Sequence, residues 1–401
     1  MHQFALILFW FSVFCILMSY LFYPELLKLF SFFKKNNFPN NSLPFSELPT
    51  VSVLMAVYNE ELVIEKKIRT VFASAYPQNK LEVFVGSDKS GDKTNQILEN
   101  LQKEFPNLFF INFADRQGKK NIINQLLDKS KGEILISTDA NVLFTENTIM
   151  ELVKCFGDPS VGLADSNMKH HGLVSNGISI QESAYISREV GIKNLEGILW
   201  GTMMGPFGGC FAIRRIAYTK VPANHLMDDF YINMKVLEKG YKSVNNLNSH
   251  VYEDVSNQFS EEFKRKIRIA AGNFQNLGAF YPLLNPFKKR GNVSALPLSF
   301  CFLMHKVLRW FGPFFLIFIG IAGLMLFSLP LYKILTILYL ASFLMVGFDF
   351  AFKKCNVHIS YFRFISHFYG MNLALLLGLV KYLKGVKTNV WQPTKRNQSN
   401  V

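Results

Sequence analysis

Four short apolar runs alternate with segments of helical pattern in the first third of the chain, and this alternation constrains the fold most. The runs cover residues 51–57, 81–86, 108–113 and 133–139, and each one ends in polar residues. Strands that alternate with helices favour a parallel, doubly wound α/β sheet. The helices expected in this part run to about Ala75 and over Lys93–Phe105 and Lys119–Lys129. No G-x-G-x-x-G or Walker loop occurs at the turns, which argues against a dinucleotide enzyme or a P-loop ATPase.

The fourth run leads directly into Asp139 and Asn141. Because ligands of open α/β sheets bind at the carboxyl ends of the strands, both side chains are expected at a ligand-binding edge. A carboxylate followed two residues later by an amide oxygen can hold a divalent cation against a diphosphate. Asp and Asn also end strands simply because they favour turns, so the pair alone leaves both interpretations open. Asp88 follows the second strand in the same way.

The middle of the chain continues with alternating elements. We expect a strand at Val161–Asp165, a long helix at Ile178–Leu199, and a glycine-rich loop with a short strand at Gly205–Arg215. A helix opens at Asp228 and Asp229, where acids are also ordinary partners of the helix dipole. A last helix, Phe259–Leu277, carries a basic stripe that suits phosphates or lipid head groups: Lys264, Arg265, Lys266 and Arg268.

Apolar segments at both ends predict a multi-pass protein of the inner (plasma) membrane. Phe4–Tyr23 is long enough to cross the hydrocarbon layer, and the lysines that follow it place the next domain in the cytoplasm. Late candidates are two spans, a third possible span and an interfacial segment: Phe311–Leu329, Leu335–Phe350, Phe364–Val380 and Leu296–Trp310. Three late spans would leave the basic tail outside, against the positive-inside rule. Either one late segment is re-entrant or interfacial, or Leu296–Trp310 inserts as well.

The composition agrees with a membrane as a partner, and it argues against nucleic acid and against a cysteine metal cluster. The net charge is +14, half of the 401 residues are hydrophobic and 40 are Phe. Basic residues gather beside the apolar segments, as expected at a cytoplasmic membrane face. They are not interleaved with stacking aromatics in the polar middle, so nucleic acid is not an expected partner. The five cysteines form no CxxC pair, which predicts reduced thiols and no cysteine metal cluster.

These patterns together divide the chain into six parts. The division is an N-terminal anchor, a linker, a cytoplasmic catalytic domain, an interfacial segment, C-terminal membrane helices and a basic tail: residues 1–30, 31–49, 50–280, 281–310, 311–385 and 386–401.

Seven pieces, taken in order, resemble the membrane-bound family 2 glycosyltransferases, the branch similar to cellulose, chitin and hyaluronan synthases. The pieces are VSVLMAVYNEE, VGSDKSGDKT, RQGKKNIIN, STDAN, GGCFAIRR, MDDFYINMKVLEKGY and EEFKRKIRIAAGNFQNL. Within that branch the chain looks most like the subgroup with Asp-Ala-Asn and Asp-Asp motifs. The resemblance implies a GT-A fold, an inverting transfer of a hexose from a nucleotide sugar, expected to be a UDP-sugar, and Mg²⁺ or Mn²⁺.

The resemblance also implies roles for individual residues. Asp229, beside Asp228, would be the general base, and Asp139, with Asn141, would face the metal and the diphosphate. The remaining positions would bind the nucleotide sugar: Ala56, Tyr58, Asn59, Glu60, Asp88, Lys119, Lys120, Arg265 and Arg268. The acceptor would be a growing polysaccharide or a lipid-linked glycan.

Three departures from the family pattern weaken parts of this reading. Asn141 replaces a second carboxylate, which puts metal ligation by that position in doubt. Arg265 and Ile269 replace the Gln and Trp of Gln-x-x-Arg-Trp, which weakens the inference of long-polymer synthesis. Phe207 lies where the subgroup would have Asp. Two alternatives therefore stay open: a single transfer onto a polyprenyl phosphate, and a non-catalytic membrane scaffold.

Overall fold

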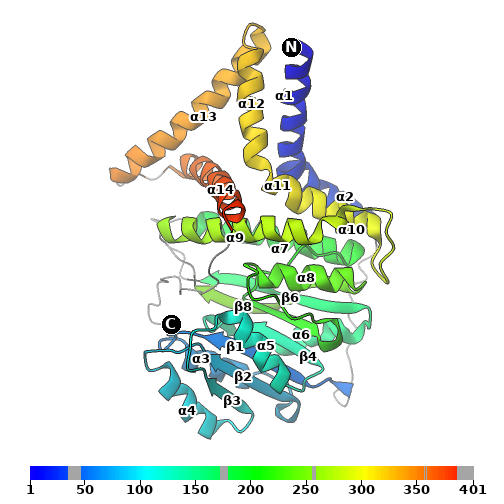
Figure 1. Ribbon diagram of the computed structural model, residues 1–401, viewed down its shortest axis with the longest axis vertical. Coiled ribbons are helices and arrows are strands. Elements are labelled where there is room, and N and C mark those ends of the chain that lie inside the picture. The colour runs from blue at the N-terminus through cyan, green and yellow to red at the C-terminus, as the bar shows by residue number, and fades with distance from the viewer. Residues whose placement is uncertain (35–46, 172–178, 255–258, 356, 358, 386–401) are drawn as a thin grey trace.

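A computed structural model describes the whole chain except residues 35–46, 172–178, 255–258, 356, 358 and 386–401. Most of the predicted linker 31–49 and all of the predicted tail 386–401 therefore lie outside the described residues. Figure 1 shows a sheet-containing domain below and a group of long helices above.

Within the described residues the sheet has eight strands in the order β3-β2-β1-β4-β7-β6-β8-β5. Their bounds are β1 Val51–Val57, β2 Leu81–Ser87, β3 Leu108–Asn112, β4 Ile134–Thr138, β5 Val142–Phe144, β6 Val161–His171, β7 Cys210–Arg214 and β8 Lys242–Asp254. The predicted α/β class is confirmed. Strands β1 to β4 pair in parallel, as expected from their alternation with helices. The other half is mixed, because β7 runs antiparallel to β4 and β6, and β5 antiparallel to β8.

Two of these strands were not expected from the sequence. β8 spans 13 residues and carries many Asn and Ser residues, so its hydropathy does not resemble that of a buried strand. It nevertheless pairs along most of β6, with register shifts near Leu163 and Asn167. β5 has three residues, too few for an alternating pattern to be recognised.

The pleat of the central strands separates the two layers of helices. In β1, Val51, Val53 and Met55 point into the larger core on one face, whereas Leu54 packs with Ile122 and Leu126 on the other. Because successive side chains alternate between faces, an uninterrupted apolar run is what a strand covered on both sides needs. The helices of this part are α3 Ile64–Phe72, α4 Thr94–Glu104, α5 Lys119–Lys129, α6 Thr148–Lys154 and α8 Asp228–Glu238.

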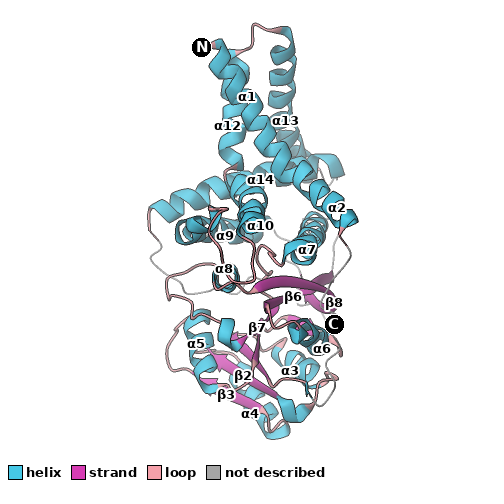
Figure 2. Ribbon diagram, turned by 90° about the vertical axis from the view of Figure 1, so that its right-hand side faces the viewer, coloured by secondary structure: helices cyan, strands magenta, loops and turns pink. Residues whose placement is uncertain are grey.

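A helical layer separates the sheet from the apolar helices. Figure 2 places α7 (Ser179–Trp200), α9 (Phe259–Phe280) and α10 (Ala295–Cys301) between the sheet and the tall helices. α10 continues through a π-helical segment, Phe302–Val307, and α11, Leu308–Trp310. This layer contains the segment that the sequence predicted to be interfacial.

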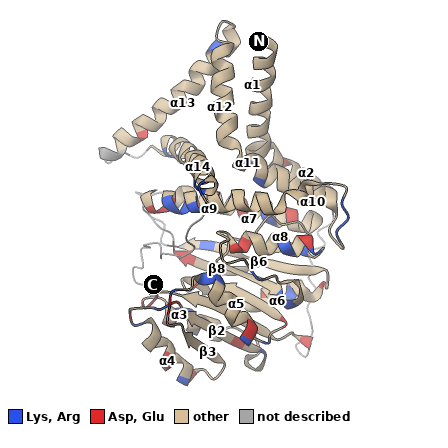
Figure 3. Cartoon of the chain, in the orientation of Figure 1, with Lys and Arg blue, Asp and Glu red and all other residues tan. Residues whose placement is uncertain are grey.

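The apolar helices are α1 His2–Leu17, α2 Tyr23–Phe33, α12 Gly312–Met325, α13 Pro330–Lys354 and α14 Ser360–Leu383. Neither α1 nor α12 contains a charged residue, and Figure 3 shows the contrast with the domain below. Among the residues that the structure describes, three stretches are long and apolar enough to cross a membrane: His2–Phe33, Pro330–Phe352 and Ser360–Leu383. The predicted span Phe311–Leu329 contains a single helix, Gly312–Met325, which has only 14 residues. It qualifies only as a bent pair, Ala295–Trp310 with Gly312–Met325, at an angle of 61°.

Candidate active site

A cavity of about 620 Å³ lies at the carboxyl edge of the parallel strands and extends to α7, α9 and α14. Of the predicted site residues, all except Asn59 line it: Ala56, Tyr58, Glu60, Asp88, Lys119, Lys120, Asp139, Asn141, Asp228, Asp229, Arg265 and Arg268. Asn59 instead joins two loops, since its Oδ1 accepts a hydrogen bond of 2.9 Å from the backbone N–H of Gly91.

Strand pairing explains why the acidic turn and the glycine-rich loop meet. β4 and β7 are antiparallel with Thr138 opposite Cys210, so the end of β4 lies beside the start of β7. The backbone N–H of Asp139 donates to the carbonyl of Gly209 over 3.0 Å. The first acid of the motif is thereby fixed against the glycine-rich loop Gly205–Gly209.

Lys119 balances the charge of Asp139. Its Nζ lies 2.6 Å from Asp139 Oδ1, because Gly118, at φ 81°, turns the chain into α5 beside the end of β4. Burial alone would lower the pKa of Lys119, but the neighbouring carboxylates Asp139 and Asp228 raise it well above its usual value. This ammonium group therefore stays charged at the edge where an anionic ligand would lie.

Asp88 organises the loop that precedes α5. Its carboxylate accepts hydrogen bonds from the backbone N–H groups of Gln117, at 2.6 Å, and Gly118, at 3.1 Å. It also accepts one from Arg116 Nε at 3.1 Å. The guanidinium of Arg116 in turn lies 3.4 Å from the centre of the Tyr58 ring. Asp88 thus ties the ends of β1 and β2 to the start of α5.

Asp228 and Asp229 open α8 inside the cavity, and their pKa values are shifted in opposite directions. Burial, then repulsion from Asp228, raises the pKa of Asp229 to about 7. Burial would also raise the pKa of Asp228, but Lys119 and Lys120 more than offset it, and the pKa is lowered. Two adjacent acids with pKa values pushed apart are typical of sites that move protons near neutral pH.

Gly208 leaves room for the carboxylate of Asp229. Its φ is +79°, and a Cβ atom added there would lie 2.6 Å from Asp229 Oδ2. A side chain at this position would be strained and would push the acid away. The glycine-rich loop therefore sets where Asp229 can sit.

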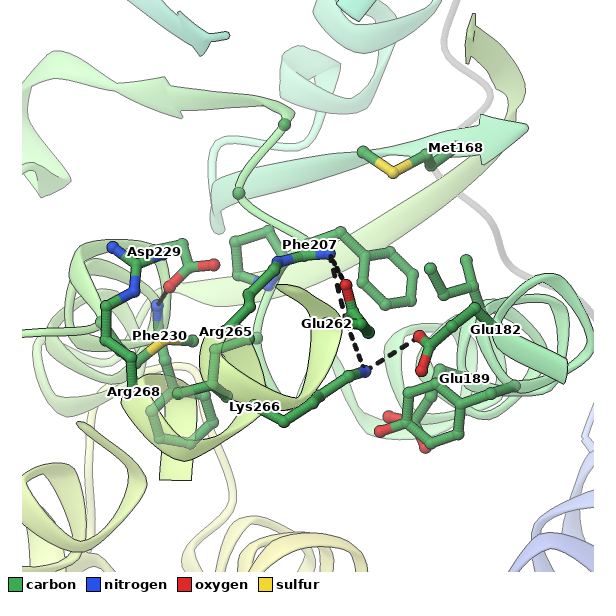
Figure 4. A pocket seen from close by; sticks show the side chains of 18 of the residues that line it. Met168, Glu182, Glu189, Phe207, Asp229, Phe230, Glu262, Arg265, Lys266 and Arg268 are labelled. Atoms are coloured by element: carbon green, nitrogen blue, oxygen red, sulfur yellow. Dashed lines mark hydrogen bonds and ion pairs between the residues drawn. The ribbon is translucent and has the colours of Figure 1, made fainter. Parts of the chain in front are cut away.

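The cations of α9 are spread along the cavity. Figure 4 shows Arg268 beside Asp229, whereas Arg265 lies next to Phe207 and Lys266 points toward Glu182. Arg265 Nη1 lies 3.2 Å from Glu262 Oε2. Of the three labelled cations, Arg268 thus lies nearest to Asp229, and Arg265 lies farther along the cavity.

The metal-binding capacity of the site is limited. Asp139 offers a carboxylate at the cavity wall, and Asn141 donates its amide to Glu253 Oε1 over 3.1 Å. In the described parts of the chain, no three His, Cys, Asp or Glu side chains are grouped to hold an ion. Mg²⁺ is often held by one or two protein carboxylates together with substrate phosphates and water. Asp139 and Asn141 fit such an ion when an anionic ligand supplies the remaining oxygens.

Several lining residues were not predicted from the sequence. Glu182 and Glu189 of α7 line the cavity. Together with Glu196 they recur every seven residues, a spacing that places all three on one face of the helix. This seven-residue spacing is the sequence feature that could have indicated an acidic face on α7. Buried Lys193, on the same helix, pairs with buried Asp165 at 2.5 Å, and its Nζ lies 3.4 Å from the centre of the Phe207 ring.

The arrangement can bind an anionic ligand and accept a proton beside it. Lys119, Lys120 and Arg268 supply positive charge, Asp139 can share a cation, and Asp229 can take up a proton near pH 7. Such a combination is typical of group transfer from a phosphate-activated donor to a hydroxyl group.

Comparisons with known proteins match two glycosyltransferase family models and several curated synthases. The family model "Glycosyl transferase family group 2" matches residues 137–352, and "Glycosyl transferase family 2" matches residues 52–221. A β-monoglucosyldiacylglycerol synthase from Trichormus variabilis is 36% identical over 29% of this chain and 25% of its own length. A poly-β-1,6-N-acetyl-D-glucosamine synthase from Staphylococcus aureus is 24% identical over 55% of this chain and 57% of its own length.

Among solved structures, the mannosyltransferase PcManGT from Pyrobaculum calidifontis, in complex with GDP-Man and Mn²⁺, has a TM-score of 0.68. The match covers 94% of this chain and 99% of that one, at 21% identity. The likeness shows a shared fold. The chain thus spans a quarter to just over half of the two curated relatives and nearly all of the structural one.

Proposed function

This chain belongs to glycosyl transferase family group 2, and from that membership we propose that it is an inverting, membrane-anchored glycosyltransferase. It transfers a hexose from a nucleotide sugar to a polysaccharide or to an acceptor carried by a lipid. The relatives cover both kinds of acceptor, since one is named as a glycolipid synthase and the other as a polysaccharide synthase.

One observation supports the proposal most strongly. Asp139, Lys119, Asp229 and Arg268 come from four separate segments and meet in one cavity. Asp139 can share a metal ion, and Lys119 and Arg268 can bind a diphosphate. The pKa of Asp229 suits a general base that works near neutral pH. A non-catalytic scaffold does not require a general base beside a group of anion-binding cations.

The donor occupies the part of the cavity next to β1, β4 and α5. Lys119, Lys120 and Arg268 meet the negative charge of its diphosphate, and Ala56, Tyr58 and Glu60 border the nucleoside. Asp139 and Asn141 would hold a Mg²⁺ or Mn²⁺ ion against the diphosphate, where its charge stabilises the leaving group. The structural neighbour with GDP-Man and Mn²⁺ supports a nucleotide sugar and a metal of this kind.

The transfer is a single displacement. The acceptor hydroxyl oxygen attacks the anomeric carbon as the bond from that carbon to the diphosphate breaks. Asp229 takes the hydroxyl proton, and the nucleoside diphosphate leaves with its electron pair toward Lys119 and Arg268. One attack from the opposite face inverts the anomeric configuration, so no enzyme nucleophile is needed.

The test uses the purified full-length protein and a panel of nucleotide sugars, including UDP- and GDP-sugars, with and without Mn²⁺. Binding stabilises the folded state by mass action, so the true donor should raise the midpoint of thermal unfolding most. The same donor, labelled, should be hydrolysed slowly or transferred, and analysis of the product's anomeric configuration should show inversion. Absence of both stabilisation and turnover with every donor would favour the scaffold reading.

A further inference from the structure

The cavity continues past the catalytic acids to the helices that face the membrane. Beyond Phe207 it is lined by polar residues of α7 and α9 and then by aromatic residues of α7 and α14. In Figure 4 Asp229 and Arg268 lie at one end, Phe207 and Arg265 in the middle, and Glu182 and Glu189 at the other end. The same cavity therefore has a polar wall next to Phe207 and an apolar wall farther from it.

The charges in the polar part of this space are compensated by one another. Lys266 Nζ lies 2.9 Å from Glu182 and 3.4 Å from Glu262, and Arg265 pairs with Glu262 at 3.2 Å. His367 of α14 lies 2.9 Å from Glu182. A phosphate would have to displace a carboxylate from these cations, whereas hydroxyl groups can donate to the carboxylates and accept from Arg265 and Lys266 without changing the charge balance.

The neighbouring cations along this part of the lining are engaged as well. Lys193 pairs with Asp165, and Lys306 and Arg309 with Glu189. The guanidinium of Arg188 donates to the carbonyl oxygen of Tyr20. A carbonyl group does not neutralise the charge of Arg188, but the other three cations are paired with acids, so the described wall at this end attracts an anion less strongly than unpaired cations would.

The apolar part is built by α14, which packs lengthwise on α9. A Cβ atom on Gly378 would lie 2.3 Å from the Cβ of Ala270, so the two helices touch directly. Phe364, Phe368 and Met371 of α14 flank His367 and line the cavity. An apolar wall beside a polar subsite can contact both parts of an amphiphile, whereas a freely soluble sugar has no apolar chain to contact the wall.

The outer face of α14 is also apolar. Tyr361 is 83% exposed, and Leu373, Leu377 and Val380 are between 39% and 50% exposed. Leu373, Leu377 and Val380 recur every three or four positions, and basic residues follow them, which is the pattern of a helix lying in a membrane interface. α14 can therefore face lipid on one side and the cavity on the other.

We propose that the part of the cavity between Phe207 and α14 is the acceptor site, and that it takes an uncharged, hydroxyl-bearing lipid head group whose chain passes along α14. This inference rests on the proposed function and deepens it by naming the class of acceptor. Arg265 is then a residue of the acceptor site.

The test compares three matched acceptors with the full-length protein in proteoliposomes and labelled UDP-glucose, UDP-N-acetylglucosamine and GDP-mannose. Dodecyl glucoside has the chain and an uncharged head, dodecyl phosphate has the chain and an anionic head, and methyl glucoside has the head alone. We expect kcat/KM for dodecyl glucoside to exceed the other two by at least about tenfold. Equal or better transfer to dodecyl phosphate or to methyl glucoside overturns the inference.

Donor hydrolysis separates this inference from the proposed function. Hydrolysis without transfer to dodecyl glucoside would overturn the acceptor class and leave the transferase proposal standing. No hydrolysis and no transfer would remove both.

Two substitutions locate the site. Lys266→Gln leaves Glu182 and Glu262 without their shared cation, and Phe368→Ala shortens the apolar wall. Each should raise KM for dodecyl glucoside by about tenfold while donor hydrolysis persists. Lys264→Gln is the matched control, because Lys264 is 75% exposed and pairs with Glu261 at 3.3 Å. Should Lys266→Gln abolish hydrolysis by misfolding, Phe368→Ala decides, and an unchanged KM in that variant would refute the site.

Discussion

Asp229 and Asp228 are neighbours in α8, yet their surroundings suit them to different tasks. Asp229 lies against Gly208 and has a raised pKa, whereas the pKa of Asp228 is lowered by Lys119 and Lys120, which outweigh its burial. An acid at a helix start contributes only about 0.3–1 kcal/mol to stability. A general base contributes on the order of 10² to 10⁴ in rate.

Asp229→Asn is therefore expected to fold and bind donor almost normally while transfer falls by at least about a hundredfold. Asp228→Asn should be milder. Steady-state rates and donor affinity of the two variants measure the difference. If Asp229→Asn keeps more than about a tenth of the rate and Asp228→Asn does not, the base has been assigned to the wrong acid.

The pH dependence gives a second measurement on the same pair. The base must be deprotonated to act, so with a pKa of about 7 for Asp229, kcat/KM should fall as the pH drops below 7. Asp228→Asn removes a like charge and should shift this acidic limb to lower pH. A limb that stays in place would show that Asp229 is not the titrating base.

Asp139 carries the expected metal dependence, because a carboxylate attracts a hard dication more strongly than an amide does. Asp139→Asn should lose both activity and the Mn²⁺-dependent rise in thermal stability with a nucleoside diphosphate. Asn141→Asp serves as the companion variant, and unchanged metal affinity there would show that position 141 is not a ligand. Full wild-type activity in the presence of a chelator would contradict the metal requirement.

At the scale of elements, the loop Gly205–Gly209 between α7 and β7 lies against Asp229, the proposed base. Gly208 has a positive φ and lies where any Cβ would meet Asp229. Gly208→Ala should lower the transfer rate by at least about tenfold through displacement of the carboxylate, with little loss of donor binding. Gly191→Ala in α7 is the control, because an added Cβ there meets nothing within 4 Å. Equal rates in both variants would refute this role of the loop.

α7 links the site to the apolar helices. Glu196 accepts hydrogen bonds from Tyr23 at 2.6 Å and from the backbone N–H of Met204 at 2.9 Å. His305 Nδ1 lies 2.7 Å from the same carboxylate. One buried acid thus joins α2, the π-helical segment after α10 and the start of the glycine-rich loop, so the anchor and the site are mechanically connected.

At the scale of the whole molecule, the arrangement of α14 offers an answer to the topology problem that the sequence raised. α14 qualifies as a span by length and composition, but it packs on α9, and Figure 1 shows it between α9 and the base of the tall helices. We propose that α1, α12 and α13 cross the membrane and α14 lies at its surface. The catalytic domain, residues 50–280, and the basic tail then share the cytoplasmic side, as the positive-inside rule requires.

Cysteine labelling of intact cells tests this topology. Cys355 is exposed and the other four cysteines are buried, so a Cys355→Ser background is suitable. Ser328→Cys, in the turn between α12 and α13, should be labelled from outside, whereas Lys93→Cys and Ser399→Cys should react only after lysis. Labelling of the tail without lysis would mean that α14 crosses the membrane, and labelling at position 93 would reverse the whole orientation.

The features that could be predicted from the sequence are those set by residues that are neighbours in the chain. The parallel strands, α5 at Lys119–Lys129 and the opening of α8 at Asp228 were readable from periodicity and turn residues. β8 was not, because the amide groups of its Asn side chains donate to partners distant in sequence: Asn245 to the carbonyl of Ser166, and Asn246 to that of Glu151. The candidate site followed from motif order, whereas the acidic face of α7 has no motif.

The sequence by itself determined the fold class, the apolar ends and the set of acids and cations, because hydrophobic periodicity, charge placement and motif order are properties of neighbouring residues. Only the tertiary structure decided which charges meet. The antiparallel pairing of β4 with β7 brings Gly208 to Asp229, neighbouring charges separate the pKa values of the two buried acids Asp228 and Asp229, and α14 packs on α9 although it has the length and composition of a span. These outcomes depend on contacts and desolvation between distant segments, which no local pattern records.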